Sequence, residues 1–176
     1  MNGAQVDRVR GAGAGAIGGL VGGVVLWAFL LFATALRGQD VWMVFKGAAT
    51  PLLGERAGEP GFDFLAVFLG AGVHFLVSVG WGALFGIFFA GLTRGATLAA
   101  GVLWGVVVWL VMFYVVLPLV GMGQVSRQVP IGFAVLEHVL FGVVVALVFV
   151  PFQRTLRRQV PPRPPLPRPE ERPVTP

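Results

Sequence analysis

Long apolar runs alternate with short polar segments along this chain. Between them, four runs carry one Glu and no Asp, Lys or Arg: Ala12–Leu36, Phe64–Leu92, Ala96–Val120 and Ile131–Phe152. A helix crosses the hydrocarbon core of a bilayer in about 20 residues, and each run reaches that length. Because lipid offers no partners for backbone polar groups, a spanning segment satisfies them internally as a helix. The pattern therefore predicts an all-α fold, a polytopic membrane four-helix bundle.

The composition agrees with a membrane protein. The 176 residues are 56% hydrophobic and only 12% charged, whereas soluble domains carry about 25% charged residues. This excludes an ordinary soluble domain and makes the lipid bilayer the principal expected partner. Cysteine is absent, which excludes disulfides and thiolate metal sites.

The second half of the chain resembles the first. Aligning Trp27 with Trp109, and His74 with His138, places small residues of one half on small residues of the other. The bundle is therefore predicted to consist of two tandem, repeat-related helical hairpins, residues 11–92 and 93–152. Small residues four apart let membrane helices approach closely, and on that basis we expect helix–helix contacts at Gly15, Gly19, Gly23, Ser78, Gly82, Gly101, Gly105 and Gly142.

The first outer loop, residues 37–61, carries a local signal of its own. Asp40 is expected to cap a short helix that begins directly after it and that Pro51 ends. Trp42 and Lys46 on this helix suit the membrane interface, where aromatic and long basic side chains are favoured. The loop is therefore predicted to lie on the membrane surface as an anchor, or as a lid over a cavity.

Arginine placement predicts the orientation. A polar lead, residues 1–10, and an Arg/Pro-rich tail, residues 153–176, flank the helices, and the tail is predicted to be extended and disordered. Both carry arginines, as does the short link at Arg94, whereas the outer loops mix basic and acidic residues. By the positive-inside rule, both termini are expected in the cytoplasm. The basic face is expected to meet anionic lipid headgroups, and no nucleic-acid partner is predicted.

Few ionisable residues lie inside the predicted spans, and such residues are functional candidates by default. His74, His138 and Glu137 are these candidates, and Trp27 and Trp109 are expected at the same depth. Three interpretations stay open. Each histidine bonds across to a neighbouring helix; or the three residues line a polar pathway for protons, an ion or a small solute, walled by the tryptophans; or both histidines ligate haem b or a transition metal.

Three segments carry a family resemblance. They are Asp40–Lys46 in the first loop, Trp109–Leu119 in the third span, and Glu137–Gly142 in the fourth. Together they resemble a family of small, uncharacterised four-helix membrane proteins of bacteria, over about residues 11–152. The resemblance implies the four-helix fold and a bacterial inner-membrane location. It implies no activity.

The leading prediction is a non-enzymatic accessory or assembly component that acts through helix packing. It would need no cofactor and would associate with itself or with another membrane protein. A small transporter or channel component is the alternative, and a haem- or metal-binding electron-transfer subunit is the third. No catalysis is predicted, because the sequence has no carboxylate pair, no His-x-x-x-His and no Ser nucleophile beside a base.

Overall fold

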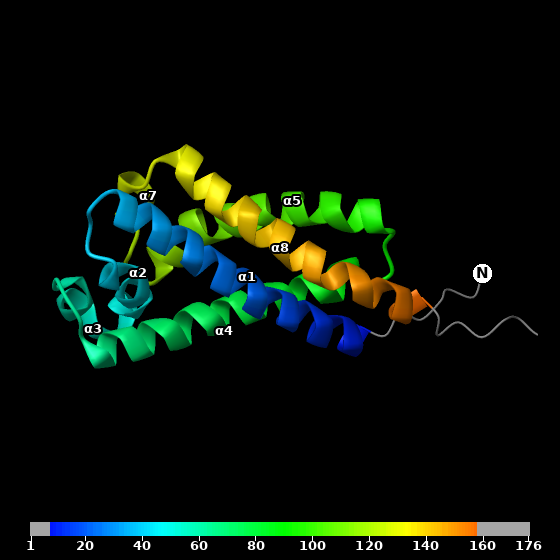
Figure 1. Ribbon diagram of the computed structural model, residues 1–176, viewed down its shortest axis with the longest axis horizontal. Helices are drawn as coiled ribbons and strands as arrows, with labels where there is room; N and C mark the ends of the chain where they lie inside the picture. Colours follow the sequence, from blue (N-terminus) through cyan, green and yellow to red (C-terminus); the bar gives the residue numbers. More distant parts are fainter. Residues whose placement is uncertain (1–7, 158–176) are drawn as a thin grey trace, which may run out of the picture.

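The computed structural model describes residues 8–157 and shows a bundle of four long helices (Figure 1). They are α1 (Arg8–Leu36), α4 (Phe64–Phe89), α5 (Arg94–Val111) and α8 (Ile131–Arg157). The described residues contain no strand, and four helical spans are long and apolar enough to cross a membrane. The predicted fold class is confirmed. The tandem repeat relation between the two hairpins stays a prediction.

Most of the predicted lead and tail lie outside the described residues, which begin at Arg8 and end at Arg157. Where the described chain overlaps them it is helical, because α1 starts at Arg8 and α8 continues through Arg157. The tail was predicted to be disordered from residue 153, but residues 153–157 are helical, and residues 158–176 lie outside the described part of the chain.

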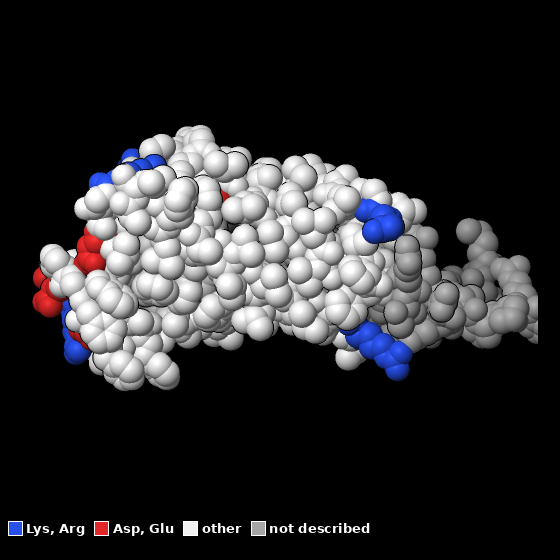
Figure 2. Space-filling view, in the orientation of Figure 1, with Lys and Arg blue, Asp and Glu red and all other residues white. Residues whose placement is uncertain are grey.

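The bundle has two distinct ends. At one end, which we call the hairpin end, α4 joins α5 through a short link, α1 begins and α8 finishes (Figure 1). The other, the loop end, holds five short elements: α2 (Trp42–Lys46), η1 (Gly47–Ala49), α3 (Thr50–Leu53), η2 (Gly54–Gly58) and α7 (Val125–Gln128). Figure 2 shows charged side chains gathered at both ends and an almost uncharged surface between them, as a membrane-spanning protein requires.

Helix α1 is central to the packing. It lies against both α4 and α8, and α8 in turn lies against α5. Helices α4 and α5 are consecutive in the chain, yet they contact each other far less than α1 contacts α4. The seam between α4 and α5 is therefore much looser than the seam between α1 and α4.

Glycines bring the backbones together within each hairpin. Between α1 and α4, a Cβ added at Gly82 would lie only 2.5 Å from Gly19 Cα. Between α5 and α8, a Cβ added at Gly142 would lie 2.6 Å from Gly105 N. Real Cβ atoms do not approach backbone this closely, so these contacts exist only because the residues lack a side chain.

A second row of glycines joins the two hairpins. A Cβ at Gly18 would lie 3.0 Å from Val145 O, and one at Gly22 would lie 2.9 Å from the Phe141 ring. The buried core follows directly, with Phe85, Val145 and Phe149 among its fully enclosed side chains. This core fills the bundle toward the hairpin end.

Helix α5 changes its winding before it ends. Residues Met112–Val116 form a π-helical segment, η3, and Leu117–Leu119 form a last α-turn, α6. Pro118 lacks an N–H and its ring clashes with the carbonyl of residue 114 in a regular α-helix. The wider turn just before it relieves that clash. Helix α5 therefore reaches Pro118 through a π-helical turn.

The outer loop differs from the prediction at the start of its first helix, where Val41 rather than Asp40 occupies the N-cap position, and at Pro51. Helix α2 begins at Trp42, whose N–H donates to Asp40 Oδ1 at 3.0 Å, while Gly61 N donates to the other Asp40 oxygen at 2.7 Å. These two bonds hold the pKa of Asp40 below its usual range. Pro51 does not end the helical stretch but lies in the first turn of α3, a position where its missing N–H costs nothing.

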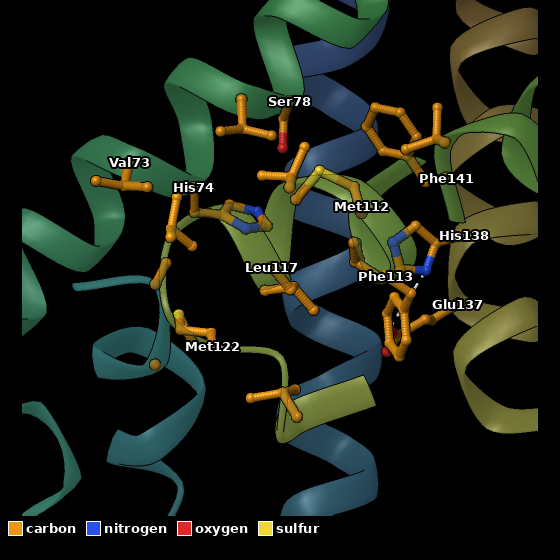
Figure 3. Close-up of a pocket in the computed structure, with 18 of the residues that line it drawn as sticks. Val73, His74, Ser78, Met112, Phe113, Leu117, Met122, Glu137, His138 and Phe141 are labelled. Carbon is orange, nitrogen blue, oxygen red and sulfur yellow. Dashed lines mark ion pairs between the residues drawn. The ribbon is translucent and has the colours of Figure 1, made fainter. Parts of the chain in front are cut away.

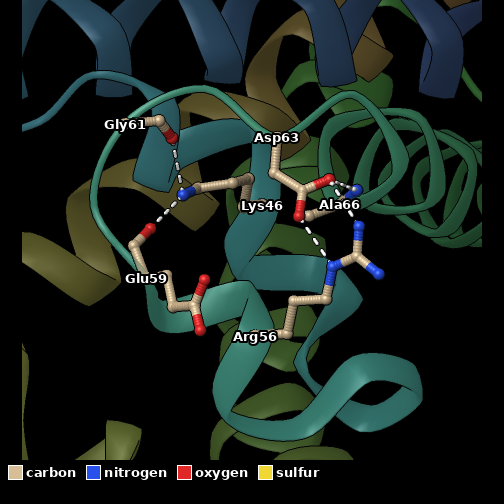
Figure 4. Close-up of polar contacts among 6 residues, drawn as sticks. All are labelled: Lys46, Arg56, Glu59, Gly61, Asp63 and Ala66. Atoms are coloured by element: carbon tan, nitrogen blue, oxygen red, sulfur yellow. Dashed lines mark hydrogen bonds and ion pairs between the residues drawn. The ribbon is translucent and has the colours of Figure 1, made fainter.

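Lys46 is the larger correction. We expected it at the membrane interface, but its side chain is completely buried. Its Nζ donates to the carbonyls of Glu59 and Gly61, the latter at 2.7 Å (Figure 4). A buried ammonium needs such partners to offset its lost hydration. Lys46 therefore fastens the end of the loop to α2, while Trp42 stays partly exposed.

The start of α4 is held by a second polar group. Asp63 accepts from Ala66 N at 3.1 Å, which caps the helix, and pairs with Arg56 Nε at 2.7 Å (Figure 4). The Arg56 guanidinium and the helix N–H lower the pKa of Asp63 to about 2, and the same ion pair raises the pKa of Arg56.

Candidate functional site

A cavity of about 590 Å³ opens inside the bundle on the side of the loop end. All four long helices contribute to it, and residues of η1 and α3 cover it at the loop end. Its walls are predominantly apolar side chains, among them Leu26, Val77, Val108, Val116 and Phe141. This is the concave, mostly apolar type of space in which small molecules bind.

Three predicted site residues meet in this cavity. His74 projects from α4 and His138 from α8 toward the space between them, with Glu137 beside His138 (Figure 3). Ser78, which we had placed among the packing residues, also lines it. The structure thus brings the two histidines and the glutamate, which lie far apart in the sequence, to one cavity.

His74 is held by α1. Its Nε2 donates to the carbonyl of Gly23 at 3.0 Å, and its ring stacks on Trp27 with centroids 4.4 Å apart and an angle of 13°. The absence of a side chain at Gly23 makes room, since a Cβ there would lie 3.2 Å from His74 Nε2. Trp27 does not line the cavity, and it acts as the platform under His74.

His138 is held by its own helix. Its Nδ1 donates to the Ala134 carbonyl, one turn earlier, at 2.8 Å, and lies 3.4 Å from Glu137 Oε1. The side chains of His138 and Glu137 are both only 12% exposed. The ring of Phe113 meets the imidazole edge to face, with centroids 5.6 Å apart. These contacts fix the ring against the cavity wall.

The remaining ring nitrogens define what the site offers a ligand. A carbonyl oxygen only accepts, so the ring nitrogen bonded to it carries the hydrogen. In a neutral imidazole the other nitrogen is then an acceptor, which is Nδ1 in His74 and Nε2 in His138. Two neutral histidines therefore present two acceptors to the cavity, suited to a donor such as a hydroxyl.

Trp109 does not join the site. It packs against Phe113 and Tyr114, with ring centroids 6.4 and 5.7 Å away, and its buried Nε1 has no hydrogen-bond partner. Trp27 and Trp109 were aligned in the sequence, but only Trp27 supports a histidine. Neither Trp27 nor Trp109 lines the cavity, so they do not form the walls that the pathway interpretation predicted for them.

Two of the predicted packing residues, Gly23 and Gly105, lie beside residues that line the cavity. A Cβ at Gly23 would be 2.8 Å from Ser78 Oγ, and one at Gly105 would be 2.6 Å from Val139 Cα. Within each hairpin, the histidine lies beside the last close glycine contact before the cavity: His74 beside Gly23, and His138 beside Gly105.

Sequence reasoning missed a second set of cavity residues. Met112 and Phe113 come from the π-helical segment, Trp81 comes from α4, and Gly47 and Ala48 come from the loop. Pro118 was a usable signal for the first two, because π-helical turns recur at functional sites and a proline favours such a turn before it. No comparable signal marks the others.

The described residues contain no cluster of three or more His, Cys, Asp or Glu side chains that could hold a metal ion. Two histidines remain the ligands that a haem or metal ion would use. His74 would have to ligate through Nδ1, because its Nε2 is bonded to Gly23.

Comparison with known proteins gives a family and no activity. No match to a curated protein or to a solved structure was found. Residues 9–160 match the model of a family of unknown function (DUF6789). This range contains every residue that lines the cavity and all four membrane spans except Arg8, the first residue of α1. Because the match covers most of the 176 residues, the chain belongs to the DUF6789 family of unknown function.

Proposed function

We propose that this protein is a non-enzymatic, multi-pass protein of the bacterial inner membrane that binds a lipid-soluble molecule inside its bundle. The ligand has an apolar body and an uncharged hydroxyl head. The protein serves as an accessory component that holds or hands over this molecule, with both termini in the cytoplasm as the arginine distribution favours.

One observation carries the proposal: an apolar cavity of about 590 Å³ has its polar groups gathered on His74, Ser78, Glu137 and His138. Apolar walls accept an apolar body, because they contain few polar groups that it would leave without partners. The free imidazole acceptors favour a donor head group. A hydroxyl combines an apolar body with a donor without bringing a net charge into the bilayer.

The pathway interpretation receives less support from the packing. On the side of the hairpin end, the space that a path would need holds the buried side chains of Phe85, Trp104, Val145 and Phe149. The polar groups of the cavity are therefore followed by a packed aromatic and aliphatic core, which favours binding over conduction.

Quenching of tryptophan fluorescence tests the proposal, because Trp81 lines the cavity. The full chain in lipid nanodiscs is titrated with 11-bromo-1-undecanol, whose bromine quenches indole, and with 1-bromoundecane, which lacks the hydroxyl. We expect saturable quenching by the alcohol and about tenfold weaker binding of the bromoalkane, the equivalent of one hydrogen bond of about 1.4 kcal/mol.

Two matched variants locate the binding. A Cβ added at Gly47 or at Gly58 meets no atom within 4 Å, but only Gly47 lines the cavity. Gly47→Phe should remove the saturable quenching, while Gly58→Phe should retain it. Equal, unsaturable quenching by both bromine compounds in the wild-type protein would contradict the proposal.

A further inference from the structure

A second, smaller hollow lies against the cavity at the seam between α4 and α5. It has a volume of about 250 Å³ and an apolar lining. Four of its residues, Val77, Trp81, Met112 and Val116, also line the large cavity. The same four side chains therefore separate the interior of the bundle from a depression on its surface.

The depression faces outward, into the region that lipid occupies. Its other two residues are Gly80, which is exposed, and Leu84, which is 39% exposed. Neither lines the inner cavity. Because both lie within the α4 span, the depression opens to the hydrocarbon of the bilayer rather than to water.

The seam closes differently at its two ends. Toward the hairpin end, Trp104 of α5 packs against Phe85, Phe88 and Phe89 of α4, with ring centroids 5.7 to 6.1 Å apart. Trp81 also packs against Trp104, with ring centroids 5.7 Å apart, and its Nε1 donates to Met112 Sδ at 3.4 Å. A thioether is a weak acceptor, so Met112 is held to α4 by a weaker contact than those of the aromatic cluster.

The α5 side of this contact combines a flexible side chain with an irregular backbone. Met112 opens the π-helical segment that also supplies Phe113 and Val116 to the cavity wall. Methionine has a flexible, unbranched side chain that adapts to different neighbours. π-Helical turns interrupt the regular backbone ladder and recur at functional sites. A rotation of the Met112 side chain would change the separation between the depression and the cavity.

We infer that the lipid-soluble ligand enters and leaves sideways, from the bilayer, through the α4–α5 seam, with the Trp81–Met112 contact as the gate. This inference rests on the proposed binding function. It adds the route, and it explains why α4 and α5 stay loosely packed although only a short link joins them.

Gly80 offers a direct test. A Cβ added at Gly80 meets no atom within 4 Å, and the same is true of Gly72, which lies on the same helix but lines neither hollow. Gly80→Phe fills the depression, and Gly72→Phe is its matched control. Stopped-flow quenching by 11-bromo-1-undecanol gives the association rate, and dilution into probe-free vesicles gives the dissociation rate.

A blocked route slows both directions equally. We expect Gly80→Phe to lower the association and dissociation rates by about tenfold or more and to leave the Kd within about twofold. Gly72→Phe should match the wild-type protein. Met112→Leu, which conserves volume but removes the acceptor of the Trp81 N–H, should raise both rates by about threefold.

The outcomes separate the route from the function. Wild-type rates in both Gly80→Phe and Met112→Leu, with saturable binding intact, would overturn the lateral route and leave cavity binding standing. A changed Kd with unchanged rates in Gly80→Phe would also overturn it. Absence of saturable quenching in the wild-type protein would overturn the binding function, and the route with it.

Discussion

The half of the bundle near the hairpin end and the half near the loop end are built from different residues. The first half is closely packed, whereas the second half contains the large cavity. In α1, every buried residue lies between Gly11 and Gly23, and none of residues 24–36 is buried. The first part of α1 touches the backbones of its neighbours, whereas the second part carries Trp27, Phe29 and Leu30 and stands away from them. The large cavity lies beside this second part.

The histidines lie at the boundary between the closely packed half and the half that contains the cavity. His74 contacts Gly23, the last glycine of the α1 row, and the backbone of His138 lies beside Gly105, the last glycine of the α5 row. Membrane helices approach closely where residues are small. When the row ends, the helices part, and the first polar side chain beyond it faces the space that opens. The close packing of one half therefore ends where the cavity of the other half begins.

The largest expected effect comes from breaking the packed half. Gly82→Val places a side chain where even a Cβ would lie 2.5 Å from Gly19 Cα, so α1 and α4 must separate. We expect a loss of about 3 kcal/mol in the free energy of unfolding, at the upper end of overpacking costs. Titration of the protein from mild detergent into SDS, followed by circular dichroism, measures it.

Gly72→Val is the matched control on the same helix. A Cβ at Gly72 meets no atom within 4 Å, so we expect it to unfold at nearly the wild-type SDS fraction. Equal stability of Gly82→Val and Gly72→Val would mean that α1 and α4 are not held by close glycine contacts, and the contrast between the two halves would fail.

Much of the packed half could be predicted from the sequence. Apolar runs of sufficient length gave the four spans, and small residues four apart identified positions such as Gly19, Gly82 and Gly142, because helical periodicity alone decides which residues share a face. His74 and His138 were candidates for a similarly local reason, since polar groups in lipid need partners.

The hollow half could not be predicted in the same way. The cavity depends on where helices diverge, on the π-helical turn at Met112 and on the loop folding back over it, and none of these is a property of one helix. The alignment of Trp27 with Trp109 was uninformative about the site, because only Trp27 meets a histidine ring. Lys46 resembled an interfacial residue until the loop supplied carbonyl partners from Glu59 and Gly61.

An intermediate effect is expected at Lys46, in the loop that covers the hollow half. Lys46→Met keeps the aliphatic stem but leaves the Glu59 and Gly61 carbonyls without the buried ammonium. Hydrogen bonds to charged groups contribute about 2 kcal/mol, so we expect the loop to open about 30-fold more often at unchanged SDS stability of the helices. Hydrogen exchange of the amides between residues 40 and 61 measures this. Unchanged exchange would show that the loop is held without Lys46.

The smallest effect sharpens the comparison at the start of α4. Asp63 has a pKa of about 2 in the folded protein against an ordinary value of 3.8. Its ion pair with Arg56 and its helix cap therefore stabilise the loop end above about pH 4, and this contribution disappears as the pH falls toward 2. Asp63→Asn can still cap α4 but cannot titrate. Asp40, whose pKa is also lowered, titrates in both proteins, so the difference between their exchange rates isolates Asp63.

We expect wild-type protection near residues 56–66 to exceed that of Asp63→Asn slightly at pH 7, because exposed ion pairs contribute little, and the two to converge below about pH 3. A difference that persists at pH 2 would place the contribution of Asp63 outside its charge, whereas convergence without any change in the cavity-lining helices would confine the pH response to the loop end.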